Sequence, residues 1–185
     1  MKRLLLVLLV LVLAAAGLAA AAVWYVRPAE SLDLAYREVD FNSKFKDLIR
    51  NRQFAVEITD SELENLLKKR LSENPNLAPG VTVTGARLER DKDIVNIHVN
   101  LLYRGKVRAG LVLRYDLSWQ SPNLTAVFRG ASVRGFTIPE GWLNPGDFKI
   151  GVNEQLPSAL GVREIVFGDR AVTVWLKLRN PLSSE

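Results

Sequence analysis

Apolar and polar side chains alternate over the fourteen residues from Val107 to Gln120, VRAGLVLRYDLSWQ. Successive side chains of a strand point to opposite faces of a sheet, so this pattern predicts a strand with one buried and one solvated face. At about 3.3 Å per residue the strand is roughly 45 Å long, so it must twist or bend, and Gly110 is a natural place for the bend. The apolar positions are Val107, Ala109, Leu111, Leu113, Tyr115, Leu117 and Trp119.

Similar alternation predicts further strands on both sides of this one. Short turns separate most of them, and consecutive strands joined by short turns form an antiparallel meander. The predicted strands cover residues 54–58, 81–90, 94–103, 124–133, 162–167 and 170–178.

A capping box predicts the start of a helix at Thr59-Asp60-Ser61-Glu62, with Ile58 and Leu63 as a hydrophobic staple. The buried stripe of this helix would contain Leu63, Leu66, Leu67 and Leu71. Apolar spacing predicts two more short helices, over residues 41–49 and 147–156. The fold class expected is therefore α+β, a curved antiparallel sheet of about six strands packed on two or three helices.

The first residues predict export. Leu4 to Val26 carry no charge, which is enough for a helix to cross a hydrocarbon core about 30 Å thick, and Lys2 and Arg3 before it place the N-terminus in the cytoplasm. The alternative is a signal peptide cleaved after Ala22. In the first case the chain is a single-pass protein of the cell membrane, and in the second it is secreted. The expected divisions are an anchor at 1–27, a membrane-proximal linker and short helix at 28–53, an extracytoplasmic domain at 54–180 and a tail at 181–185.

Charge and cysteine content narrow the class of protein. Without Lys2, Arg3 and Arg27, the chain has 22 basic and 20 acidic side chains, so no strongly basic domain points to nucleic acid. The absence of cysteine excludes disulfides and thiolate metal sites. A basic group around one turn, Arg104, Lys106, Arg108 and Arg114, is either a solvated face or a contact for anionic lipid or wall polymer.

Catalytic chemistry is not indicated. The single histidine, His98, lies between Asn96 and Asn100 on the more polar face of its strand, where a solvated or hydrogen-bonded side chain is expected. Asp91 and Asp93 at a hairpin tip lack the further oxygen ligands of a calcium loop, so turn chemistry explains them. We therefore expect no enzyme, no catalytic residue, no metal site and no cofactor.

The apolar faces remain as a candidate site. They can form a filled core or, if the curved sheet leaves space beside its helices, a groove for an acyl chain, and both interpretations use the same residues. The groove would be lined by Leu63, Leu67, Leu111, Leu113, Tyr115 and Trp119, with Phe136 and Trp142 near its mouth.

The block FAVEITDSELENLLKKRL from Phe54 to Leu71, the apolar N-terminus, the long strands up to Trp119 and the segment GFTIP at 135–139 suggest a family. In these features the chain resembles the YpmS-like family of uncharacterised, membrane-anchored envelope proteins of Gram-positive bacteria, and departs from it at GWLNPG. The resemblance implies an extracytoplasmic domain with no known enzymatic activity. The order of elements is also similar to that of tubular lipid-binding proteins, which is an analogy of fold only.

Two functions therefore remain open. The first is a non-enzymatic, membrane-anchored module that binds a lipid or lipid-linked envelope precursor in its apolar groove. The second is a protein-interaction scaffold of a cell-envelope complex, with a filled core and a working outer surface. The expected partners are the membrane, through residues 4–26, and either a lipid ligand or an envelope protein.

Overall fold

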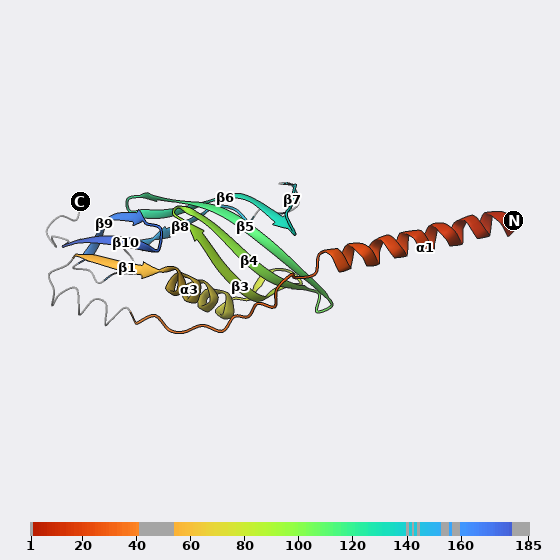
Figure 1. The fold of residues 1–185 in the computed structure, drawn as a ribbon, viewed down its shortest axis with the longest axis horizontal. Helices are drawn as coiled ribbons and strands as arrows, with labels where there is room; N and C mark the ends of the chain where they lie inside the picture. The colour runs from red at the N-terminus through yellow and green to blue at the C-terminus, as the bar shows by residue number, and fades with distance from the viewer. Residues whose placement is uncertain are drawn as a thin grey trace.

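The computed structural model describes residues 2–40, 54–139, 141, 143, 145–152, 156 and 160–178, with side chains from Leu9 onward. Its largest element is a seven-stranded antiparallel sheet (Figure 1). Strands β2 to β7 follow one another across this sheet in sequence order, and β8 pairs with the part of β6 that β7 leaves free. The strands are β2 (Asn76–Ala78), β3 (Val81–Asp91), β4 (Ile94–Tyr103), β5 (Val107–Gln120), β6 (Asn123–Val133), β7 (Phe136–Ile138) and β8 (Phe148–Gly151).

A second, three-stranded antiparallel sheet lies at the end of the domain remote from the N-terminus (Figure 1). Its strand order is β1 (Ala55–Thr59), β10 (Ala171–Leu178) and β9 (Leu160–Phe167). The chain therefore leaves the small sheet after β1, builds the large sheet, and returns through the hairpin of β9 and β10.

Helix α3 (Asp60–Glu73) follows β1 directly and packs against β1 and β3. The predicted capping box is confirmed, because the Glu62 amide donates to Oγ1 of Thr59 and the Thr59 amide donates to Oε2 of Glu62. Glu64 accepts a hydrogen bond from the Leu88 amide at 3.1 Å, and this contact holds α3 beside β3.

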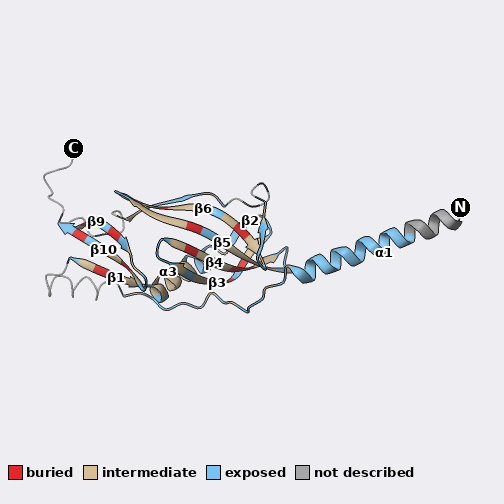
Figure 2. Ribbon diagram, turned by 45° about the horizontal axis from the view of Figure 1, so that its top comes forward, coloured by how far each residue is buried: buried red, intermediate tan, exposed pale blue. Residues whose placement is uncertain are grey.

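Helix α1 (Lys2–Tyr25) projects away from the domain, and its described side chains are almost all exposed (Figure 2). Within the described part of the chain, no helix combines the length and apolar composition that crossing a membrane requires. The prediction of a transmembrane helix over residues 4–26, and of a single-pass topology with it, is corrected by this finding.

The predicted α+β class is also wrong, because the described chain is mainly β with two helices, α1 and α3. One predicted helix is replaced by a strand, since Phe148–Gly151 forms β8 and pairs with Asn123–Ala126 of β6. Because β7 pairs only with Ala131–Val133, the edge of β6 at Asn123–Ala126 is free to pair, and a strand there satisfies the backbone groups of Phe148–Gly151. The other predicted short helix, over residues 41–49, lies outside the described residues.

Two apolar clusters form the core (Figure 2). One lies within the small sheet and consists of Val56, Val162, Ile165, Val172, Val174 and Leu176. The other lies on one face of the large sheet and consists of Ala86, Val99, Leu113, Tyr115 and Ala131, with Leu67 and Leu71 of α3 packed against it. We call this the α3 face, and the opposite face, which carries Asn96, His98 and Arg114, the outer face.

A strap of chain, residues 26–33, crosses the outer face from β5 over β4 to β3. The strap accepts three hydrogen bonds from successive strands: the Gly110 amide to the Val26 oxygen at 2.9 Å, the Asn100 side chain to the Glu30 oxygen at 2.8 Å, and the Ala86 amide to the Asp33 oxygen at 3.1 Å. It runs over the cross-strand row Gly85, Asn100 and Gly110. Beyond the edge of β3 the chain continues to α3, where the Arg37 amide donates to Asn65.

Candidate functional site

The α3 face is the apolar side of the large sheet, as the alternation along β5 predicts. Strand register places Ile97 beside Leu113, Val99 beside Leu111 and Val95 beside Tyr115, all on this face. Because β5 is confirmed from Val107 to Gln120, the odd-numbered residues of the predicted pattern share one side of the sheet.

The structure separates the predicted groove residues into three places. Leu113 and Tyr115 are buried in the α3-face cluster, and Leu67 and Leu111 pack against that cluster. Leu63 and Trp119 pack instead against the cluster of the small sheet. Phe136 is 69% exposed near α1, and Trp142 lies outside the described residues.

Helix α3 covers the α3 face incompletely. It packs on β3, at one side of the large sheet, and none of its residues is buried. Its four stripe leucines, Leu63, Leu66, Leu67 and Leu71, all keep partial exposure. On the sheet, Ala109, Leu111, Leu117 and Phe128 are likewise only half-buried. Apolar surface therefore remains accessible between α3 and the strands β5 and β6.

Three aromatic rings line the side of this face that is remote from α3. The Tyr115 ring lies 5.4 Å from that of Phe128 and 5.6 Å from that of Phe148, between centroids. Phe148 is 48% exposed, whereas Tyr115 is only 3% exposed. Burial, with a smaller contribution from the Asp147 carboxylate, raises the pKa of Tyr115 to about 12. The phenol is therefore neutral at physiological pH and adds no charge to the apolar face.

The outer face carries a polar network around His98. Its ring Nε2 lies 3.1 Å from Oε2 of Glu89, and Glu89 also pairs with Arg87. Arg87 and, to a smaller extent, His98 lower the pKa of the Glu89 carboxyl, while hydrogen bonding to Glu89 raises that of Arg87. Glu30 of the strap also pairs with Arg87, with 3.2 Å between Nε and Oε2. Within the described chain, no group of three or more histidine, cysteine, aspartate or glutamate side chains could hold a metal ion.

A cleft of about 720 Å3 lies between the strap and the outer face, close to the base of α1. Its lining includes three cations, Arg27, Lys106 and Arg108, together with Thr84 and Asn100. Sequence reasoning missed this cleft, because it identified the basic turn but took residues 28–53 to be a membrane-proximal linker and a short helix. The signal was a pair of glycines, Gly85 and Gly110, on either side of Asn100 in one cross-strand row, and this row becomes visible once the strand register is known.

No protein-family model, curated protein or solved structure matches the chain. The resemblance to the YpmS-like family therefore stays a prediction.

Proposed function

We propose that this protein is a non-enzymatic binding module that holds the acyl chain of a lipid, or of a lipid-linked envelope precursor, against the α3 face. The observation that carries the proposal is that α3 has no buried residue although its leucine stripe faces an apolar sheet. A filled core would bury such side chains, because each one removed from water stabilises the fold by about 1.5–3 kcal/mol.

The bound chain would lie between α3 and the strands β5, β6 and β8. Leu67 and Leu111 would form its walls, and the half-exposed Phe148 would cover one side. Binding sites for apolar ligands are mostly lined by aliphatic and aromatic side chains, and this lining has both. The proposal includes a location outside the cytoplasm, which the signal-peptide-like pattern from Lys2 to Ala22 supports.

Native mass spectrometry of the full chain, with parallel extraction and analysis of lipids, tests this function. Leu111→Trp should displace the lipid, since it adds volume to the half-buried wall of the α3 face. Arg114→Trp is the matched control, because Arg114 is exposed on the outer face of the same strand. The exposed apolar side chains of α1 can also retain lipid, so the difference between the two variants decides the outcome. Equal lipid in both variants, with both folded by circular dichroism, would overturn the proposal.

A second candidate function, the protein-interaction scaffold, is favoured by an apolar patch on the face of the small sheet that points away from its buried cluster. Val166 and Trp175 lie on this face and are 42% and 37% exposed. If Leu111→Trp retains as much lipid as the parent protein, we expect this patch to be the surface that binds a partner protein. In that case, Trp175→Ser should abolish crosslinking to an envelope protein, whereas Leu111→Trp should not.

A further inference from the structure

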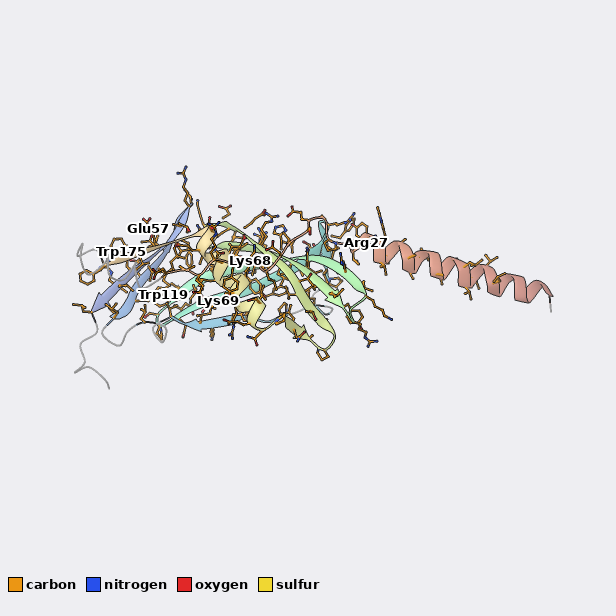
Figure 3. All side chains as sticks on the ribbon, turned by 90° about the horizontal axis from the view of Figure 1, so that it is seen from below. Arg27, Glu57, Lys68, Lys69, Trp119 and Trp175 are labelled. Atoms are coloured by element: carbon orange, nitrogen blue, oxygen red, sulfur yellow. The ribbon has the colours of Figure 1, made fainter. Side chains whose placement is uncertain are left out.

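Four segments meet at the end of the domain from which α1 projects. They are the base of α1 with the start of the strap (24–29), the turn between β2 and β3 (79–80), the β4–β5 turn with the start of β5 (103–108), and the β6–β7 turn with the start of β7 (134–136). The Arg104 amide donates to the Gly80 oxygen at 2.7 Å, and Nη2 of Arg134 lies 3.5 Å from the Arg27 oxygen. Figure 3 shows Arg27 at this end and Trp175 at the opposite one. We call these four segments the α1-end surface.

The α1-end surface is purely basic. It carries five cationic side chains and no carboxylate: Arg27, Arg104, Lys106, Arg108 and Arg134. All five residues are exposed, and none of them forms an ion pair with a described residue. The basic and acidic residues of the whole chain are otherwise close to balance, so the excess at this end is local. Such a cluster attracts an anionic surface.

Exposed aromatic side chains are interleaved with these cations. Trp24, Tyr103 and Phe136 are 62%, 44% and 69% exposed. The Arg134 guanidinium lies 5.5 Å from the Trp24 ring and 5.7 Å from the Tyr25 ring, and Arg104 lies 5.3 Å from the Tyr103 ring. Aromatic rings beside arginine and lysine are typical of the headgroup region of a membrane, where the rings reach the acyl boundary and the cations contact phosphate.

The cleft beside the strap borders this surface. Arg27, Lys106 and Arg108 line it together with Thr84, Asn100 and one carboxylate, that of Glu30, which pairs with Arg87. Its volume of about 720 Å3 is in the range of small-molecule sites. Three cations against one carboxylate leave the lining of the cleft positively charged, which suits a phosphate ester.

We propose that the α1-end surface docks on a membrane that contains anionic lipid, with a lipid headgroup in the cleft beside the strap. A soluble polyanion would satisfy the five cations, but it would leave the aromatic side chains and the exposed apolar side chains of α1 in water. A lipid surface covers both. This inference does not rest on the lipid ligand of the α3 face, and it concerns the end of the domain from which α1 projects.

Binding of the full chain to vesicles tests the docking surface. Vesicles of phosphatidylcholine alone and of phosphatidylcholine mixed with phosphatidylglycerol are compared by co-sedimentation, so that binding through the apolar side chains of α1 contributes to both. The triple variant Arg104→Glu, Lys106→Glu, Arg108→Glu should reduce binding to the anionic vesicles by at least about 100-fold, since each lost cation costs about a factor of five and the three added carboxylates are repelled. Binding of the variant to neutral vesicles should be unchanged, and added salt should weaken the binding of the parent protein to anionic vesicles.

A matched control keeps the net charge of that variant. Lys149→Glu, Arg170→Glu, Lys177→Glu changes three exposed cations away from the α1-end surface. The control should keep the preference for anionic vesicles to within about two-fold, since these cations lie beyond the Debye length of about 10 Å from a docked surface.

Equal losses in both triple variants would overturn the proposal, as would equal binding of the parent protein to both kinds of vesicle. Binding to soluble polyphosphate without a vesicle preference would identify a polymer as the partner and would also overturn it. Loss of lipid from Leu111→Trp tests the α3 face separately.

Discussion

The guanidinium of Arg90 donates a hydrogen bond from Nε to Oδ1 of Asp60 at 2.6 Å, and the Arg90 side chain is fully buried. Nη1 of the same residue donates to the Lys92 oxygen at 2.8 Å and to the Gly168 oxygen at 2.6 Å. Arg90 lies on β3, Asp60 begins α3, and Gly168 lies in the turn between β9 and β10. One side chain therefore joins the large sheet, the helix and the small sheet.

Removing the charge of Asp60 should weaken this junction. Asp60→Asn leaves the buried cation of Arg90 without its anionic partner, so the free energy of unfolding should fall by about 3 kcal/mol. Asp91→Asn is the control, because Asp91 is exposed at the nearby hairpin tip and its replacement should change stability by less than about 0.5 kcal/mol. Urea denaturation measures both. Equal effects would show that Asp60 does not stabilise Arg90.

Replacing Gly85 should detach the strap from the outer face. A methyl group at Gly85 would overlap the backbone oxygen of Leu32, which cannot move without moving the strap. In Gly85→Ala we expect faster hydrogen exchange at the Ala86 and Gly110 amides, because both donate to strap oxygens. Gly17→Ala is the control, since no atom lies within 4 Å of the added methyl group there. Unchanged protection in Gly85→Ala would contradict the close contact.

Tyr115 should make stability depend on alkaline pH. Its pKa is about 12 in the folded chain and near 10 when unfolded, so the folded state holds the phenol proton more tightly. The contribution of the protonated phenol to the free energy of unfolding is fully present below about pH 10, and it is lost as the pH rises through about 12. The free energy of unfolding of Tyr115→Phe should therefore fall by up to about 2 kcal/mol less than that of the parent protein over this pH interval. Urea denaturation at each pH measures the difference. Tyr103→Phe, at an exposed site, should behave like the parent protein. Parallel stability curves for parent and Tyr115→Phe would contradict the burial of the phenol.

The capping box should stabilise α3 measurably. Thr59→Ala removes the acceptor of the Glu62 amide and should cost about 1 kcal/mol. Ser61→Ala, an exposed change in the first turn of the same helix, should cost clearly less. Thermal unfolding followed by circular dichroism compares them. A Thr59→Ala protein as stable as Ser61→Ala would show that the cap contributes nothing.

Local patterns identified individual elements well. The alternation from Val107 to Gln120 predicted β5 with its observed bounds, and Thr59 with Glu62 predicted the start of α3. Both signals depend on residues close together in the sequence. The two-sheet architecture could not be read in this way, because β1 pairs with β10 across more than a hundred residues and nothing near Val56 points to Val174.

The candidate sites were predictable only in part. Apolar alternation indicated which side chains share the α3 face, but their division between two clusters depends on where α3 and the small sheet lie. Gly110 was interpreted as a bend in the strand, whereas a Cβ atom there would lie 2.8 Å from Cα of Pro28. The small residue makes room for a crossing segment, and that segment contributes to the cleft.

The strap also determines how a mechanical load would enter the domain. A pull on α1 reaches the Val26–Gly110 hydrogen bond first, then the Glu30–Asn100 bond, then the Asp33–Ala86 bond, and only afterwards the contact of Arg37 with α3. Because the first three hydrogen bonds are formed with neighbouring strands, they break one after another and not all at once. Tension on the N-terminus is therefore absorbed on the outer face, and α3 and the apolar face beneath it are strained last.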